Sequence, residues 1–174
     1  FAMQLVDPNV NISIILPEMI VAVTGIIVML YDSFFPRHRG VTGTISLLGL
    51  AASAVFLSMI WSADSGVPAM AWSGMIIHDN LRLSFSFVFL LVSALTILIS
   101  TVWVDREDIA AGEYHALLMF ATFGMMLMAS GNDFVVIFLG LETLSIATYV
   151  MAGLRKGDLK SNESAMKYFI LGSL

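Results

Sequence analysis

The sequence predicts an all-α fold, a polytopic bundle of transmembrane helices. Of its 174 residues, 59% are hydrophobic and only 12% are charged, whereas a soluble domain has roughly 25% charged residues. Its apolar runs are long enough to cross a bilayer, since about 20 helical residues at ~1.5 Å each cover a ~30 Å hydrocarbon core. One such run, Phe134–Gly153, contains a single charge, Glu142.

Five complete spans are expected, with a tight turn before the last. Only Gly131, Asn132 and Asp133 separate the fourth and fifth spans, so these two must be antiparallel neighbours. The longest connection, residues 62–82, contains glycines and Pro68 and predicts an ordered interfacial loop or hairpin. The expected spans, of which the fourth is short, are Ile12–Tyr31, Val41–Trp61, Leu83–Val104, Tyr114–Ser130 and Phe134–Gly153.

A sixth span begins near Ser161 and is incomplete. Its 14 residues to Leu174 reach only ~21 Å at ~1.5 Å each, which is less than the hydrocarbon core. Its last carbonyls would be unsatisfied in lipid, and Phe1 is not an initiator methionine. We therefore expect a single transmembrane domain over residues 1–174, an N-terminal fragment of a longer chain.

The distribution of basic residues predicts the orientation. Loops on one side hold six Lys and Arg residues, and the other side holds only Arg82. Because cytoplasmic loops are enriched in Lys and Arg, the N-terminus is expected on the periplasmic side, or its mitochondrial equivalent. The six are Arg37, Arg39, Arg106, Arg155, Lys156 and Lys160.

Glu142 is the first candidate functional residue. It lies near the middle of its span, where an ionisable group costs roughly 2.5–3.5 kcal/mol on insertion scales and usually serves ions or protons. Ser145 and Tyr149 follow at i+3 and i+7, so the three share one helix face. This face predicts a proton or ion relay inside a helix bundle. The alternative is a protonated glutamate that makes one interhelical hydrogen bond.

Lys167 is the second candidate and has two interpretations from its position. A lysine in a membrane span is the cationic counterpart of a buried glutamate, and its pKa shifts readily on desolvation. Glu163, however, lies at i−4, in the order that favours an ion pair on the helix surface. The residues alone leave both interpretations open.

Glu113 and Glu18 both read as acids near the start of a helix. Glu113 opens the fourth span, where a carboxylate complements the helix dipole. Glu18 follows Pro17 at the start of the first span and receives the same interpretation. Gly49 and Ser53, four residues apart, allow close helix packing.

The composition also excludes several chemistries. Zero cysteines exclude disulfides, thiolate metal sites and iron–sulfur ligation by this chain. The three histidines are too widely spaced for a metal motif, and no glycine-rich phosphate loop is present. We expect no metal or cofactor bound by this chain, and no nucleic-acid partner.

Three segments together resemble the antiporter-like membrane subunits of respiratory complex I, most closely the subunit N group, equivalent to mitochondrial subunit 2. One is Glu113–Ser130, the next is Phe-Leu-Gly-Leu-Glu142-Thr-Leu-Ser, and the last is Ser-Asn-Glu-Ser-Ala-Met-Lys167-Tyr-Phe-Ile-Leu-Gly. The opening segment Leu16-Pro-Glu-Met is also similar to the start of that subunit.

The resemblance implies a fold of fourteen helices with inverted repeats of five helices, and proton translocation driven by quinone reduction elsewhere in the complex. Glu142 matches the family's fifth-helix glutamate, Lys167 its sixth-helix lysine and Glu113 a fourth-helix glutamate. All three are thereby implied in a proton relay. The family's central lysines would lie beyond Leu174.

The implied mechanism couples Glu142 to a lysine on a neighbouring helix, so that the protonation of each depends on the other. The chain would be an obligate hetero-oligomer with other membrane subunits of complex I, in the lipid bilayer of a bacterial inner or mitochondrial inner membrane. NADH, FMN, iron–sulfur clusters and quinone would be bound elsewhere in the complex.

Two other functions remain open. The first is a subunit of a multi-subunit Na⁺/H⁺ antiporter, which shares the glutamate–lysine chemistry. The second is a membrane scaffold that transports nothing, in which Glu142 is a structural hydrogen-bonding group. Replacement of Glu142 by glutamine would leave pumping intact in the scaffold.

Overall fold

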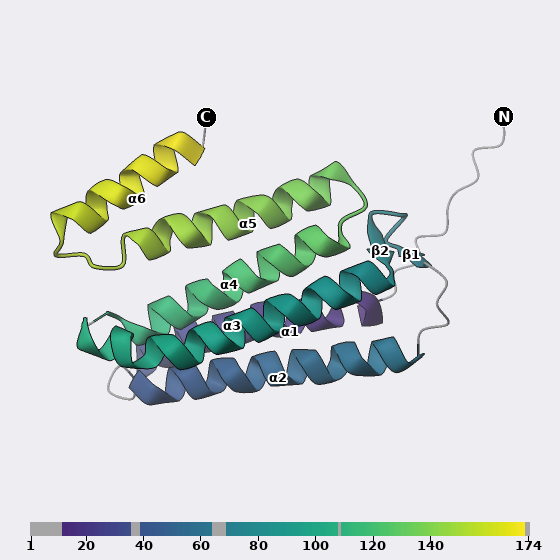
Figure 1. Ribbon diagram of the computed structural model, residues 1–174, viewed down its shortest axis with the longest axis horizontal. Helices are drawn as coiled ribbons and strands as arrows, with labels where there is room; N and C mark the ends of the chain where they lie inside the picture. Colours follow the sequence, from purple (N-terminus) through teal and green to yellow (C-terminus); the bar gives the residue numbers. More distant parts are fainter. Residues whose placement is uncertain (1–11, 36–38, 64–68, 108, 173–174) are drawn as a thin grey trace.

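The computed structural model describes residues 12–35, 39–63, 69–107 and 109–172. Four long helices form a bundle, a fifth lies along the fourth, and a shorter sixth packs on the fifth (Figure 1). A short two-stranded hairpin joins the second and third helices of the otherwise helical described residues, where the sequence predicts a loop or hairpin. The elements are α1 Ile12–Phe34, α2 Arg39–Ala63, β1 Ala69–Ala71, β2 Ile76–His78, α3 Asn80–Arg106, α4 Ala111–Ser130, α5 Phe134–Ala152 and α6 Leu159–Gly172.

Four helices of the described residues are long and apolar enough to cross a membrane: α1, α2 over Gly40–Ser62, α3 and α5. These correspond to four of the five predicted spans. Helix α4 does not qualify, because its first two turns carry Glu113, Tyr114 and His115. That α4 crosses the bilayer therefore stays a prediction. Helix α6 begins at Leu159, two residues before the predicted start.

Helix α4 is nevertheless the centre of the arrangement. It packs against α1, α2, α3 and α5. The methionine-rich stretch of α4 supplies the core residues Met119 and Met126, because flexible thioether side chains fill irregular gaps well. The buried core cluster consists of Val21, Leu50, Leu57, Leu83, Leu90, Ile97, Met119 and Met126.

Helix α3 presents a regular seam to this core. Buried apolar residues alternate with buried serines at spacings of three and four, which places all of them on one face. Small serines let neighbouring helices approach closely. At the middle of the seam the hydroxyls of Ser93 and Thr122 are 2.6 Å apart, which joins α3 to α4. The seam is Leu83, Ser86, Leu90, Ser93, Ile97, Ser100 and Val104.

Glycines permit two close helix contacts. A Cβ atom at Gly49 would lie 2.3 Å from the Thr24 side chain, so α1 and α2 meet here, as the Gly49–Ser53 pattern predicts. A Cβ atom at Gly124 would lie 2.7 Å from the Gly140 carbonyl oxygen, and one at Gly140 would lie 2.8 Å from the Gly124 carbonyl oxygen. Helices α4 and α5 therefore touch through their backbones.

The predicted loop or hairpin of residues 62–82 contains a hairpin, and its turn is tied to the turn between α4 and α5. Trp72, Ser73 and Gly74 all have positive φ angles, of 54°, 57° and 84°. The backbone N–H of Asn132 donates to the Met75 carbonyl at 2.8 Å, and its side-chain amide donates to the Gly74 carbonyl at 2.8 Å. Helices α4 and α5 are antiparallel neighbours, as their short turn predicts (Figure 1).

Candidate functional site

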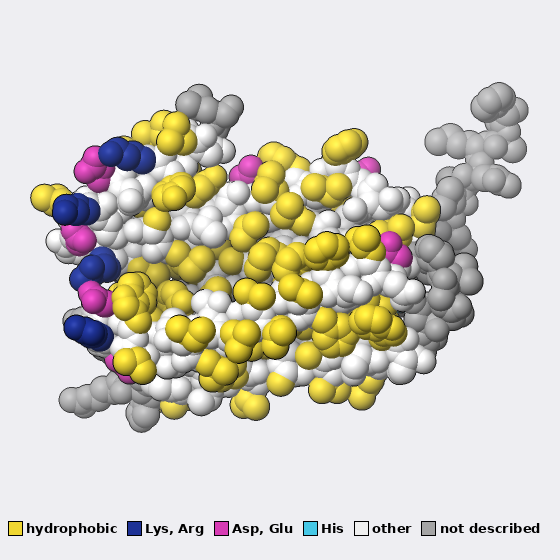
Figure 2. Space-filling view, in the orientation of Figure 1, with side chains coloured by type: hydrophobic (Ala, Val, Ile, Leu, Met, Phe, Trp, Pro, Cys, Tyr) yellow, Lys and Arg dark blue, Asp and Glu magenta, His cyan; other side chains and the backbone are white. Residues whose placement is uncertain are grey.

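Charged side chains gather at one end of the described molecule. On the face in Figure 2, Lys and Arg lie only at the end where the α3–α4 and α5–α6 connections meet, interspersed with acids. The middle of that face is mostly apolar. Arg37 and Asp108 belong to this end by sequence and lie outside the described residues.

Glu142 is half-buried in the middle of α5. The face of α5 that contains Gly140, Leu144 and Ala147 packs against α4. Glu142 is about 200° around the helix from Gly140, at roughly 100° per residue, so it points away from α4. Within the described residues it has neither a hydrogen bond nor an ion pair.

The polar stripe of Glu142 leads toward α6. Tyr149, at its far end, stacks edge-on against Phe169 of α6, with ring centroids 6.3 Å apart. A Cβ atom at Gly172, at the end of α6, would lie 1.8 Å from the Tyr149 hydroxyl. Glu142 lies two turns further along α5, about 10 Å at ~1.5 Å per residue. The stripe therefore shares a face with the α5–α6 contact.

Lys167 lies on an exposed face of α6. Its Nζ is 2.5 Å from Glu163 Oε1, and the two side chains are 69% and 63% exposed. The i,i+4 pair that the sequence allows is thus formed, and the structure does not bring Lys167 to Glu142. This contact is the one expected from the surface ion-pair interpretation.

Glu113 lies in the first turn of α4, as expected. Its Oε1 accepts from Lys156 Nζ at 2.8 Å, and its side chain is 43% exposed. It also lines a cavity of about 220 Å³ between α1, α4 and α5, beside Met29 and Phe120. The sequence did not predict the lysine partner, which lies 43 residues away.

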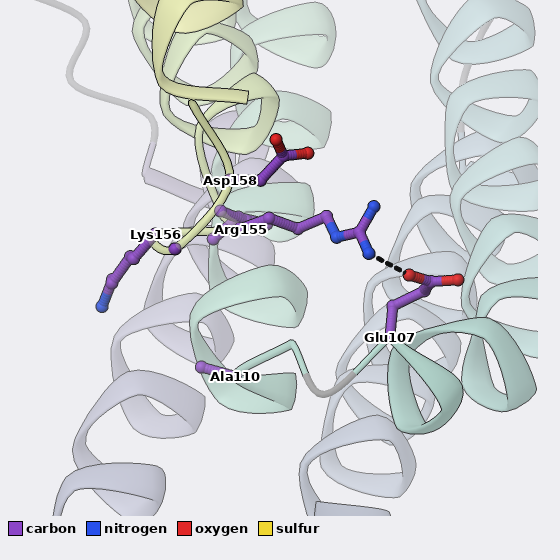
Figure 3. Close-up of a pocket in the computed structure, with 7 residues that line it drawn as sticks. Glu107, Ala110, Arg155, Lys156 and Asp158 are labelled. Atoms are coloured by element: carbon purple, nitrogen blue, oxygen red, sulfur yellow. Dashed lines mark hydrogen bonds and ion pairs between the residues drawn. The ribbon is translucent and has the colours of Figure 1, made fainter. Parts of the chain in front are cut away.

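A second ion pair joins the same two connections. Figure 3 shows Arg155 of the α5–α6 loop reaching Glu107 at the end of α3, while Lys156 points the other way. Both residues line a surface pocket of about 410 Å³ that also includes Ala110 and Asp158. The α5–α6 loop is therefore anchored by two ion pairs, one to Glu107 at the end of α3 and one to Glu113 in the first turn of α4.

The first-turn interpretation of Glu18 is wrong. Helix α1 begins at Ile12, so Glu18 lies inside the helix and is fully buried at 0% exposure. Its Oε1 accepts from Arg82 Nη2 at 2.6 Å, and Arg82 is 1% exposed. The sequence held a signal that could have found this pair. The two residues carry opposite charges near those ends of their apolar helices that lie beside the hairpin.

Backbone carbonyl groups near the start of α1 accept side-chain donors from two neighbouring helices. Arg82 Nη2 donates to the Ile14 carbonyl at 2.6 Å, and the Ser53 hydroxyl donates to the Pro17 carbonyl at 2.9 Å. Polar side chains of α2 and α3 therefore fasten α1 at the end that lies beside the hairpin.

His78 and Asp79 complete this buried cluster. The Asp79 carboxylate caps α3 by accepting from the backbone N–H of Arg82 at 2.8 Å. His78 Nδ1 lies 3.5 Å from Arg82 Nη1. A guanidinium group only donates hydrogen bonds, so Nδ1 is the acceptor in this contact. Glu18 Oε2 and Arg82 Nε are buried without a protein partner.

His115 forms a separate polar contact at the opposite end of the bundle. It is 2% exposed, and its Nδ1 lies 3.2 Å from the Thr42 hydroxyl of α2. Across the described ranges, no three His, Cys, Asp or Glu side chains are placed to hold a metal ion.

Comparison with known proteins gives a consistent family. Residues 130–174 match the family described as "NADH:quinone oxidoreductase/Mrp antiporter, TM". NADH-quinone oxidoreductase subunit N of Trichlorobacter lovleyi is 38% identical over 95% of this chain and 33% of its own length. NAD(P)H-quinone oxidoreductase subunit 2 of Synechococcus elongatus is 36% identical over 95% of this chain and 31% of its own.

A solved structure agrees with these relatives. Respiratory complex I from Thermus thermophilus with bound aureothin contains a chain that superposes with a TM-score of 0.69 at 27% identity, covering 90% of this chain and 33% of that one. This chain thus spans about a third of the length of the relatives it matches. It is an integral, multi-pass membrane protein, and it belongs to the antiporter-like complex I membrane subunits, in the subunit N group.

Proposed function

We propose that this chain acts in proton translocation, as part of a membrane subunit of an NADH:quinone oxidoreductase. The observation that carries the proposal is Glu142, a carboxyl group held half-buried in the middle of a membrane-spanning helix with no partner among the described residues. Such a group is costly in a bilayer and marks proton or ion pathways. The similarity to subunit N sequences supports the same function.

In this function Glu142 exchanges protons with a lysine on a neighbouring helix. The charge on each group favours the charged form of the other, so moving the two together or apart changes which one holds the proton. Lys167 is the candidate lysine within this chain. Its role requires that it leave Glu163, its partner at 2.5 Å. NADH, FMN, iron–sulfur clusters and quinone belong to other subunits of the complex.

Glu113 is proposed as the relay group nearest the inner aqueous phase. It is 43% exposed and paired with Lys156 at 2.8 Å, so water can reach it directly. Six basic residues lie in the loops on the same side of the predicted spans as Glu113, which supports a cytoplasmic or matrix location for this end. The N-terminus then lies on the periplasmic side.

A Na⁺/H⁺ antiporter subunit is the alternative that a specific observation supports, because the matching family includes Mrp antiporters. The two functions differ in what drives transport. The intact complex should reduce quinone with NADH and pump protons without sodium. Sodium–proton exchange without NADH oxidation would instead favour the antiporter.

The proposal is tested by Glu142→Ala and Glu142→Gln in the complete complex. We expect both to assemble and to pump fewer protons per NADH oxidised, because each removes the titrating group from the path. Glu142→Asp should retain more activity. The measurement is NADH-driven proton uptake by inverted membrane vesicles.

Thr143→Val is the matched control, since the Thr143 hydroxyl bonds only to the Leu139 carbonyl of its own helix. It should pump normally. Unchanged pumping in Glu142→Gln would favour the scaffold function and contradict the relay.

A further inference from the structure

We infer that the buried ion pair of Glu18 and Arg82, acting through the β1–β2 hairpin and Asn132, positions the start of α5 and thereby Glu142. We call the unit formed by Glu18, Arg82, His78 and the hairpin turn the outer clamp. This inference rests on the proposed function, since it assigns these groups a positioning role for the relay carboxylate.

The ion pair between Glu18 and Arg82 is rigid. Glu18 and Arg82 are 0% and 1% exposed, and Arg82 binds Glu18 and the Ile14 carbonyl, both at 2.6 Å. Charges that are fully removed from water are held strongly by their partners, because losing one leaves the other uncompensated. Helices α1 and α3 are therefore locked together at their outer ends.

The Glu18–Arg82 ion pair is connected to the hairpin through His78 and Asp79. His78, the last residue of β2, lies 3.5 Å from Arg82 through its ring nitrogen. Asp79 follows it and caps α3 at the backbone N–H of Arg82. The hairpin therefore enters α3 directly through the residues that surround the buried guanidinium group.

The hairpin is connected in turn to the start of α5. Two residues other than glycine, Trp72 and Ser73, adopt positive φ angles of 54° and 57°. Strained backbone of this kind persists only where the surroundings impose it, and it is common at functional sites. Here it presents two successive carbonyl groups to Asn132, at 2.8 Å each. Ile76 also forms an antiparallel bridge with Gly131.

The contact between Asn132 and the hairpin turn fixes where α5 begins. Asn132 and Asp133 lead directly into α5, where Asp133 caps the helix at the Val135 N–H. Seven residues into α5, Gly140 rests on the backbone of Gly124. A rotation of α5 about this contact would redirect Glu142, which lies two residues past it. Because α5 starts at the α4–α5 turn (Figure 1), the position of that turn sets the direction of Glu142.

The opposite end of this arrangement is held differently. The α5–α6 loop is anchored by the pairs Lys156–Glu113 and Arg155–Glu107, whose basic side chains are 75% and 48% exposed. Exposed ion pairs contribute little and are screened by salt. The outer clamp is therefore the firmer of the two attachments of α5.

The test uses Asn132→Ala and Glu18→Gln in the complete complex, with proton uptake and NADH oxidation measured on the same vesicles. We expect Asn132→Ala to assemble, since its side chain is exposed. Both variants should lose protons pumped per NADH to the extent seen with Glu142→Ala, while oxidising NADH at the normal rate per assembled complex. Asn80→Ala, an exposed asparagine at the same end, is the control and should change neither quantity.

A purely structural role would have a different result. It would lower the amount of assembled complex and leave the ratio of protons to NADH unchanged, and an unchanged ratio in Asn132→Ala overturns the inference. Because the two residues act through one unit, the double variant should pump no worse than the poorer single variant. Additive losses would also contradict the inference.

If Glu18→Gln fails to assemble, Glu18→Leu combined with Arg82→Met replaces it, since an apolar pair of similar volume can substitute for a buried ion pair. A lowered ratio supports the positioning role and a normal ratio overturns it. Glu142→Ala separates this inference from the proposed function. If Glu142→Ala lowers the ratio and Asn132→Ala does not, only the outer clamp fails.

Discussion

Lys167 and Arg82 show that two basic side chains on helices of one chain can lie in opposite surroundings. Both are basic residues within α-helices, yet Arg82 is 1% exposed and bound to Glu18, whereas Lys167 is 69% exposed and paired with Glu163. Arginine suits the buried site because its planar donors match a carboxylate and a carbonyl at once. Lysine suits a relay, because its pKa shifts readily.

Substitution of Lys167 distinguishes a relay from a surface ion pair. A helix-surface pair contributes only ~0.2–0.5 kcal/mol, so its loss from either side should be mild and equal. For a relay, Lys167→Ala should reduce proton pumping well beyond Glu163→Ala, as measured by uptake in vesicles. Lys167→Arg should restore it only partly, because arginine does not release its proton readily. Small and equal effects of both alanine variants would assign Lys167 to the surface pair.

The helix pair α4 and α5 depends on glycine rather than on large side chains. Both helices read as simple apolar segments, and the contact between them is made where Gly124 faces Gly140. Backbones that approach this closely gain van der Waals packing that replaces the hydrophobic effect, which lipid does not supply between helices. The polar stripe of α5 is left free to face elsewhere.

Gly140→Ala should destabilise this pair. Its Cβ would lie 2.7 Å from Met128 Cγ and 2.8 Å from the Gly124 carbonyl oxygen, and the backbone oxygen cannot move cheaply. Overpacking of this kind typically costs about 1–3 kcal/mol. The thermal stability of the detergent-solubilised complex should fall. Gly157→Ala is the matched control, because nothing lies within 4 Å of its new Cβ, and an equal loss there would refute the packing argument.

The charge asymmetry of the bundle predicts its orientation in the membrane. The Arg155–Lys156 loop lies at one end of the structure, and the hairpin and the α4–α5 turn lie at the other (Figure 1). Basic residues are retained on the cytoplasmic side of membranes, so the hairpin end should face the periplasm.

Labelling can test this directly, because the chain has no cysteine. A single cysteine at Gly157 should react with a membrane-impermeant maleimide in inverted vesicles and not in intact cells. A cysteine at Asn80, which is also exposed, should show the reverse pattern. The same pattern for both sites, or the two patterns exchanged, would contradict the orientation.

The sequence was sufficient to predict four of the five expected spans, the α4–α5 turn and the position of Glu142 within its helix. Each of these depends on the local order of residues, because the bilayer acts on every apolar segment separately. The sequence offered the Lys167–Glu163 pair as one of two interpretations, because the members of the pair lie one helical turn apart, and the structure forms the pair. The starts of α4 and α6 differ from the predicted starts by two or three residues, since helix ends depend on capping and nearby contacts.

Only the tertiary structure revealed the partners of Glu18 and Glu113. Arg82 is 64 residues from Glu18, and Lys156 is 43 residues from Glu113. No periodicity links residues so far apart, because their contact depends on which helices become neighbours and how each is rotated. That choice is made by packing at sites such as Gly49 and Gly124. Hydropathy therefore specifies the segments, and side-chain volume at the helix contacts specifies which charges meet.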